Sequence, residues 1–131
     1  MSTPSRSAIA AHGKKILSAG HNSAILRTRN AVVETAGYHV VTTKDSELLL
    51  DLAKKQHFDA VVLCNSMPSR IRASVARELK ALKPALPLII ICSYTEQLEF
   101  QKIADEVVIA EHGVSQPLIE ALTKVAGEPE D

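Results

Sequence analysis

Aromatic residues are scarce in this 131-residue sequence: tryptophan is absent, and Phe and Tyr together make up only 3%. Apolar residues nevertheless account for 46% of the chain. Val, Ile, Leu and Ala must therefore fill the core, and the length is sufficient for one domain. Only two cysteines occur, Cys64 and Cys92, which excludes the disulfide framework of a small secreted protein. Both end apolar segments, where reduced, buried thiols are expected.

Net charge is also lacking, because 15 basic and 15 acidic residues cancel. The chain therefore has no global field that would draw it to nucleic acid or to an anionic membrane. Long hydrophobic runs are missing too: residues 86–92 form the longest, far short of the roughly 20 residues of a membrane-spanning helix. The polar N-terminus has no apolar segment of a signal peptide. We expect a cytoplasmic protein that binds neither membranes nor nucleic acid.

What is present is a regular alternation of short apolar segments with amphipathic ones. Continuous β-branched runs such as residues 88–92 are typical of strands buried on both faces of a parallel sheet. The segments between them have apolar residues at helical spacing. The expected strands are residues 15–19, 38–42, 60–64, 88–92 and 106–110. The expected buried helix positions are Ile25, Val32 and Ala36, then Leu48, Leu49 and Leu52, then Ile71, Val75, Leu79 and Leu82, and finally Leu118, Leu122 and Val125.

Strict alternation of strand and helix predicts an α/β fold with a doubly wound parallel sheet of five strands and helices on both faces. The domain is expected to span residues 14–126. Residues 1–13 are predicted to be a flexible N-terminal tail and residues 127–131 an acidic C-terminal tail. In such sheets the functional residues lie at the carboxyl ends of the strands, so the residues that end these five strands determine the chemistry.

Several short segments of this sequence occur in the same order along the chain as in a known protein family. Residues 59–68 combine an apolar strand with a loop that ends in Met67-Pro68, and a helix earlier in the chain ends in Ala36-Gly37-Tyr38. These features resemble the receiver domain of bacterial response regulators. The resemblance covers about residues 14–126 and implies a flavodoxin-like sheet with strand order 2-1-3-4-5. Further matching segments are residues 15–22, 25–27, 34–41, 87–94 and 104–110.

The resemblance also implies a chemistry whose residues are missing here. A receiver domain phosphorylates an aspartate after strand three, holds Mg²⁺ with acidic residues after strand one, and uses a hydroxyl on strand four and a lysine on strand five. The corresponding positions here are Gly20 and His21, then Cys64, Cys92 and Ala110. Mg²⁺ requires hard oxygen ligands, and without metal and lysine nothing offsets the charge of a transferring phosphoryl group. The resemblance with these substitutions therefore predicts a pseudo-receiver with no cofactor and no enzymatic activity.

The remaining aspartates do not replace the missing acceptor. Asp59 and Asp105 precede their strands and are expected at the opposite edge of the sheet, and Asp45 follows the outermost strand. The favoured interpretation is a phosphorylation-independent protein-interaction module in bacterial signal transduction, of the two-component or phosphorelay type. The resemblance implies docking on the face of the fourth helix, fifth strand and fifth helix, for a protein partner or a second copy. The matching residues are 95–103, 106–110 and 115–125.

A second interpretation uses the same edge of the sheet differently. His21, Cys64 and Cys92 are expected at the ends of adjacent central strands, with His112 nearby, and such a cluster could bind Zn²⁺ or respond to an oxidant. The sequence contains no CxxC or HxxxH spacing that would fix ligand geometry. The simpler interpretation is that two small apolar thiols fill space left by polar groups, and a metal or redox sensor is the alternative.

The third helix is rich in basic residues. No aromatic residues are interleaved with them, so a solvated helix face is favoured over a nucleic-acid patch. His21, Ser66 and Ser93 suggest a hydrolase only weakly, because no nucleophile elbow is present. The basic residues are Arg70, Arg72, Arg77, Lys80 and Lys83.

Overall fold

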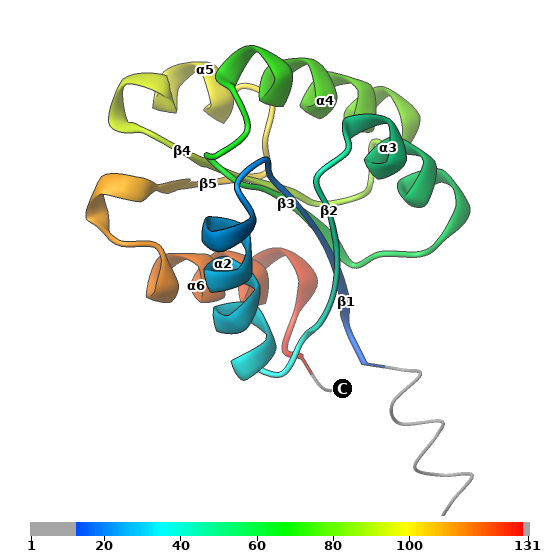
Figure 1. Cartoon of the computed structure of the whole chain (residues 1–131). Helices are drawn as coiled ribbons and strands as arrows, with labels where there is room; N and C mark the ends of the chain where they lie inside the picture. Colours follow the sequence, from blue (N-terminus) through cyan, green and yellow to red (C-terminus); the bar gives the residue numbers. More distant parts are fainter. Residues whose placement is uncertain (1–12, 130–131) are drawn as a thin grey trace, which may run out of the picture.

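The computed structural model describes residues 13–129 and contains one parallel five-stranded sheet of order β2-β1-β3-β4-β5. This confirms the predicted fold class and strand order (Figure 1). Of the predicted N-terminal tail, residues 1–12 lie outside the described residues, as do residues 130–131 at the C-terminus. The strands are β1 (Lys15–Ala19), β2 (His39–Thr43), β3 (Ala60–Leu63), β4 (Leu88–Cys92) and β5 (Glu106–Ile109).

Helices cover both faces of the sheet: α2 and α6 lie on one face, and α3, α4 and α5 lie on the other (Figure 1). None of the helices within residues 13–129 is long and apolar enough to cross a membrane. The helices are α2 (Ser23–Thr35), α3 (Ser46–Lys55), α4 (Ser69–Leu82), α5 (Gln97–Gln101) and α6 (Ser115–Ala126), with short 3₁₀ helices η1 (Tyr94–Glu96) and η2 (Ala110–His112).

The core consists of two apolar clusters, one on each side of the sheet. Every residue of β3 and β4 is buried, as their continuous apolar runs predict. One cluster packs beneath α3, α4 and α5 around Leu63, Ile90 and Phe100. The other packs beneath α2 and α6 around Val62 and Leu118. With so few aromatic residues, aliphatic side chains supply nearly all of this buried surface.

The predicted buried face of α2 is wrong by one residue. The buried side chains are Leu26 and Val33, whereas Ile25 is exposed and Val32 is only partly buried. A shift of one residue rotates a helical stripe by about 100°. Helix α2 lies over the edge of the sheet, so the sheet covers only a narrow stripe of the helix surface. The side chain of Asn22 caps the helix by accepting a hydrogen bond from Ile25 N at 2.9 Å.

The predicted stripe of α4 is also partly wrong. Ile71 and Leu82 are 37% and 38% exposed, because the helix approaches the sheet through the small side chains of Ala73 and Ala76. Arg72, which was expected on a solvated face, is buried with 3% exposure. In α3, likewise, Leu49 is buried and Leu48 is exposed.

Two aspartates fasten the amino edge of the sheet. Asp59 accepts a hydrogen bond from Lys15 N at 2.7 Å, and Asp105 accepts one from Leu88 N at 2.7 Å. Asp105 also forms an ion pair with Lys80 at 2.6 Å. Both carboxylates therefore lie at the edge opposite to the strand ends, as their positions before β3 and β5 predict, and both have structural partners there.

Candidate functional site at the carboxyl edge of the sheet

Parallel pairing brings the substituted positions to one edge of the sheet. Gly20 directly follows β1 and donates a hydrogen bond to Thr43 O at 3.3 Å. Cys64 follows β3 and donates from its backbone N–H to Ala19 O at 2.8 Å. Cys92 is the last residue of β4, and Ala110 follows β5. The predicted site positions thus share an edge, at the point where chain order reverses between β1 and β3.

Ser66 fills the space beside Gly20. Its hydroxyl oxygen accepts hydrogen bonds from His21 N at 3.0 Å and Asn22 N at 3.2 Å, which satisfies donors at the start of α2. A Cβ atom at position 20 would lie 2.8 Å from Ser66 Oγ and 2.9 Å from Cys64 Cβ. These distances are too short for any side chain larger than glycine unless the neighbours move, so an acidic metal ligand does not fit at this position.

The thiols of Cys64 and Cys92 are both buried, but their surroundings differ. Cys64 and Cys92 are both free and both 0% exposed. Cys92 belongs to the apolar cluster beneath α3, α4 and α5, whereas Cys64 donates its S–H to Asn65 Oδ1 at 3.5 Å. Burial, reinforced by the negative charge of Glu96, raises the pKa of Cys92 to about 11. Cys92 is therefore a protonated thiol at neutral pH, as the packing interpretation predicts.

His21 does not join the thiols as a metal ligand set. It is exposed, whereas the thiols lie below the surface. Among residues 13–129, no three His, Cys, Asp or Glu side chains come together in a way that could hold a metal ion. The residues at this edge also do not fit Mg²⁺, because a glycine, an imidazole and a thiol supply no hard oxygen ligand.

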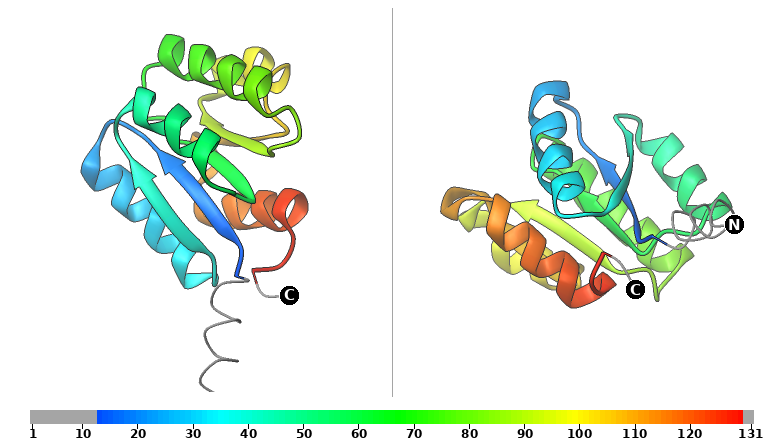
Figure 2. Two further views of the ribbon diagram at one scale, coloured as in Figure 1. Left: turned by 90° about the vertical axis from the view of Figure 1, so that its right-hand side faces the viewer. Right: turned by 90° about the horizontal axis from the view of Figure 1, so that it is seen from below.

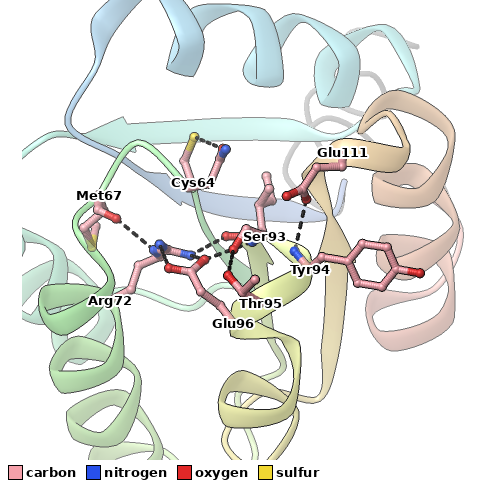
Figure 3. A network of polar contacts seen from close by, with 10 residues as sticks. Cys64, Met67, Arg72, Ser93, Tyr94, Thr95, Glu96 and Glu111 are labelled. Carbon is pink, nitrogen blue, oxygen red and sulfur yellow. Dashed lines mark hydrogen bonds and ion pairs between the residues drawn. The ribbon is translucent and has the colours of Figure 1, made fainter.

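A polar network built on buried Arg72 occupies the adjoining part of this edge (Figure 3). Its guanidinium donates to Met67 O and Ile91 O, both at 2.8 Å. It also forms a bidentate ion pair with Glu96, at 3.2 Å and 3.0 Å. The guanidinium lies 4.9 Å from the centroid of the Phe100 ring, a cation–π contact. One side chain thus connects the β3–α4 loop, β4, η1 and α5.

Glu96 stays charged in this network. Burial alone would raise its pKa, but hydrogen bonds from Ser93 N and from the Arg72 guanidinium, together with the positive charge of Arg72, lower the pKa below its ordinary value. The contact with Ser93 N measures 2.9 Å. Such charge-assisted, bidentate hydrogen bonds are among the strongest in proteins. The Arg72–Glu96 pair therefore fastens the segment after β4 to the start of α4.

The loop after β5 is fastened to the same segment. Glu111 accepts a hydrogen bond from Tyr94 N at 3.1 Å, and the rings of Tyr94 and His112 meet edge to face at 5.0 Å. Tyr94 and Leu98 are nevertheless 60% and 77% exposed. The contacts with Glu111 and His112 hold Tyr94 beside the loop after β5, and Leu98 lies in the adjoining helix α5.

Sequence reasoning missed the structural roles of four residues of this edge: Ser66, Arg72, Glu96 and Glu111. Two of them had a signal. Ser93 and Glu96 have the Ser-x-x-Glu spacing of a capping box, which indicates an ordered turn after β4. Arg72 lies at helical spacing from buried Ala76 and Leu79, which places it on the inner face of α4.

The fold and this edge define the class of protein: a doubly wound α/β domain with the receiver fold. No protein-family profile and no curated protein sequence matches the chain, but solved structures do. A response regulator receiver domain from Clostridium thermocellum is 24% identical, with a TM-score of 0.75 over 86% of this chain and 94% of that one. The sequence resemblance is therefore confirmed at the level of the fold.

Two further solved structures are similar. The receiver domain of a sensor histidine kinase from Pseudomonas aeruginosa, which has a magnesium ion in its active-site cleft, is 19% identical with a TM-score of 0.75. It covers 88% of this chain and 98% of that one. The chemotaxis protein CheY4 from Vibrio cholerae is 19% identical with a TM-score of 0.72, covering 86% and 98%.

Proposed function

We propose that the chain is a phosphorylation-independent receiver-like module of bacterial signal transduction, cytoplasmic and without catalytic activity, that acts by binding a protein partner. The observation that carries the proposal is the Arg72–Glu96 network, combined with the chemistry of the strand ends. Position 64 carries a buried thiol in place of a carboxylate, and Gly20 leaves no space for an acidic ligand. None of the five positions that match the family's reactive residues supplies a carboxylate, a hydroxyl or a lysine for phosphoryl transfer; they are Gly20, His21, Cys64, Cys92 and Ala110.

The network also opposes conformational switching. A switch needs two states of similar free energy, one of which the signal binds more tightly. Here the segment after β4 is held by Arg72 on one side and by Glu111 on the other. A second state in which the pair is broken would leave the buried guanidinium of Arg72 without its carboxylate partner, which is unfavourable, so that state is expected to be rarely populated. The docking surface is then presented continuously.

The partner surface in this proposal is the face formed by α5, β5 and α6. Leu98 and Tyr94 are the two most exposed of the large apolar side chains in residues 13–129, and both lie at this face. Large apolar side chains that remain exposed together mark interaction sites, and aromatic residues such as Tyr94 are enriched in the residues that dominate binding. The proposed partner is a protein of the same signalling system.

The first experiment tests the missing chemistry. The protein is incubated with acetyl phosphate and Mg²⁺ and its intact mass is measured, with the Vibrio cholerae chemotaxis protein treated in parallel as the control. We expect no acid-labile phosphoryl adduct, because no carboxylate stands at the acceptor position. A stoichiometric adduct on this chain would contradict the proposal.

The second experiment tests the docking surface. Binding to candidate histidine kinases and phosphotransfer proteins of the source organism is measured by titration calorimetry, with and without acetyl phosphate. We expect the same affinity in both conditions and at least a tenfold loss for Leu98→Ser. The matched control is Leu48→Ser, which removes an exposed leucine of α3; this helix packs on β1 and β2, whereas α5 packs on β4 and β5. Affinity that depends on acetyl phosphate, or equal effects of the two substitutions, would refute the proposed mode of binding.

A further inference from the structure

The other edge of the sheet carries a feature that the proposed function does not use. Strand β2 is the edge strand next to β1, and α2 lies beside it (Figure 2). His39 N bonds to Lys14 O and Gly20 N bonds to Thr43 O, so residues 39, 41 and 43 direct their backbone groups toward β1. By strand alternation, Val40 and Thr42 direct their N–H and C=O groups outward.

This edge lacks the features that usually protect a free strand. Proteins blunt such edges with charged residues, proline or bulges. Strand β2 reads His-Val-Val-Thr-Thr and contains none of these. The opposite edge strand differs, since β5 begins with Glu106, which forms an ion pair with Lys124 at 2.9 Å. Of the two edge strands, β2 is therefore the one whose free edge is better suited to pairing with another strand.

A groove of about 490 Å³ runs between α2 and β2, and most of its surface is apolar. On the α2 side, four lining residues follow helical spacing: Arg27, Asn30, Ala31 and Glu34. The positive and negative charges stand at the two ends of this stripe, and a small residue stands near its middle. Asn30 Oδ1 is buried and has no hydrogen-bond partner.

We propose that two copies of the chain form a dimer through the free edge of β2, pairing antiparallel about Val41. In this register Val40 of one copy lies opposite Thr42 of the other, and each pair exchanges both N–H···O bonds. A two-fold axis perpendicular to the sheet makes the contact self-complementary. It also keeps both α2 helices on the same face, side by side and antiparallel, so that Arg27 of each copy faces Glu34 of the other.

The heights of helix and strand agree with this register. Lys44 Nζ donates to Ser23 Oγ at 2.7 Å, so the start of α2 lies within reach of a lysine side chain from the end of β2. Val41 lies about 10 Å below Lys44 at the rise of a strand. The midpoint of the stripe, between Asn30 and Ala31, lies about 11 Å below Ser23 at the rise of a helix. The centre of the strand pairing and the centre of the charge pattern therefore lie at similar heights, to within the reach of the Lys44 side chain.

The occupant is identified as a second copy by this charge pattern. A partner of uniform charge would meet one attractive and one repulsive end, whereas an identical copy related by a two-fold axis satisfies both ends at once. The dimer uses the edge opposite to β5, so it leaves the face of α5, β5 and α6 open on both copies. The inference does not depend on the proposed function.

The test is a charge swap in the full chain, with the dimer dissociation constant measured by sedimentation equilibrium. Arg27→Glu and Glu34→Arg each place like charges opposite one another twice per dimer, and we expect each to raise the dissociation constant at least tenfold. The double variant restores opposite charges and is expected to return within about threefold of the wild type. Both residues are exposed, and they are too far apart on α2 to interact within one copy.

Two further variants check the strand pairing and the controls. Thr42→Pro removes an outward donor without breaking the bonds to β1 and is expected to weaken the dimer at least tenfold. Arg77→Glu makes the same charge change at an exposed position of α4 and is expected to leave the dissociation constant unchanged. A wild-type chain that stays monomeric up to millimolar concentration overturns the inference. A dimer that ignores Arg27→Glu and Thr42→Pro also overturns it, because the copies then meet elsewhere.

Discussion

Substitution of Arg72 by methionine is the most direct test of the network at the carboxyl edge. Methionine keeps an unbranched apolar stem that packs against Phe100, but it removes every hydrogen bond of the guanidinium. Met67 O and Ile91 O then lose the donor that now reaches each at 2.8 Å. Glu96, whose side chain is 23% exposed, can turn toward water, so its carboxylate is not left stranded.

The expected cost follows from these losses. A buried polar group left without its partner costs about 1–3 kcal/mol, and two carbonyl oxygens, Met67 O and Ile91 O, lose the guanidinium. Loss of the partly exposed ion pair with Glu96 adds to this cost. We therefore expect Arg72→Met to lower the free energy of unfolding by about 3–5 kcal/mol. Domains of this size have total stabilities of about 5–15 kcal/mol, so the variant should remain folded in buffer.

Urea unfolding followed by circular dichroism measures the effect. With a typical urea dependence of about 2 kcal/mol per molar, the midpoint should fall by about 2 M. Arg77→Met on the exposed face of the same helix is the control and should change stability by less than about 0.5 kcal/mol. If Arg72→Met costs less than about 1 kcal/mol, the guanidinium does not fasten the segment after β4 and the reasoning fails.

Glu96→Gln gives an independent check through pH. The pKa of Glu96 is lower in the folded chain than its ordinary value of 4.5. Its contribution to stability is therefore complete above about pH 4.5 and is lost as pH falls through the folded pKa. The stability difference between wild type and Glu96→Gln should be largest near pH 7 and shrink toward pH 3. If the difference does not change with pH, the carboxylate of Glu96 is not held by the charge of Arg72.

Three further outcomes are expected. Both thiols of the native protein should react with N-ethylmaleimide at pH 8 at least a hundredfold more slowly than in urea, because both are buried and a pKa of about 11 leaves only about one part in a thousand of Cys92 ionised. Rapid labelling together with a bound metal, both abolished by His21→Ala, would instead favour a sensor. Gly20→Ala should destabilise by about 1–3 kcal/mol through overpacking against Ser66 and Cys64, and thermal unfolding should show less than additive loss when Ser66→Ala is added. Tyr38→Phe should cost about 1 kcal/mol in urea unfolding, because it removes the 2.8 Å hydrogen bond from Tyr38 Oη to Gly127 O; no change would mean that this bond contributes nothing.

The fold could be predicted from sequence because its strongest signals are local. Residues 88–92 form an uninterrupted apolar run, which at that length is typical of a strand buried on both faces. The strand ends were less predictable. Tyr38 was assigned to β2, but its N–H bonds to Val33 O at the end of α2, so the strand begins one residue later. Ala110 was assigned to β5, yet it begins the 3₁₀ turn η2.

The site was predictable in position but not in its contacts. Register with the resembling family placed Gly20, Cys64, Cys92 and Ala110 at strand ends, because register depends on counting along strands. The Arg72–Glu96 pair joins residues 24 positions apart; helical spacing can place Arg72 on the inner face of α4, but nothing local indicates which carboxylate it meets. Burial of Arg72 depends on the small residues around it, Ala73 and Ala76, which bring the helix close to the sheet.

The ends of the described chain lie close together at the amino edge, where Lys14 N bonds to Pro129 O at 3.3 Å. Figures 1 and 2 show both ends of the described chain at this edge, opposite to the carboxyl edge. Circular permutation requires chain ends that lie close together, as these do. A short glycine-serine linker from residue 129 to residue 13, with new termini opened in the exposed turn at residues 84–85, should preserve the strand order while reversing which half of the sheet is synthesised first.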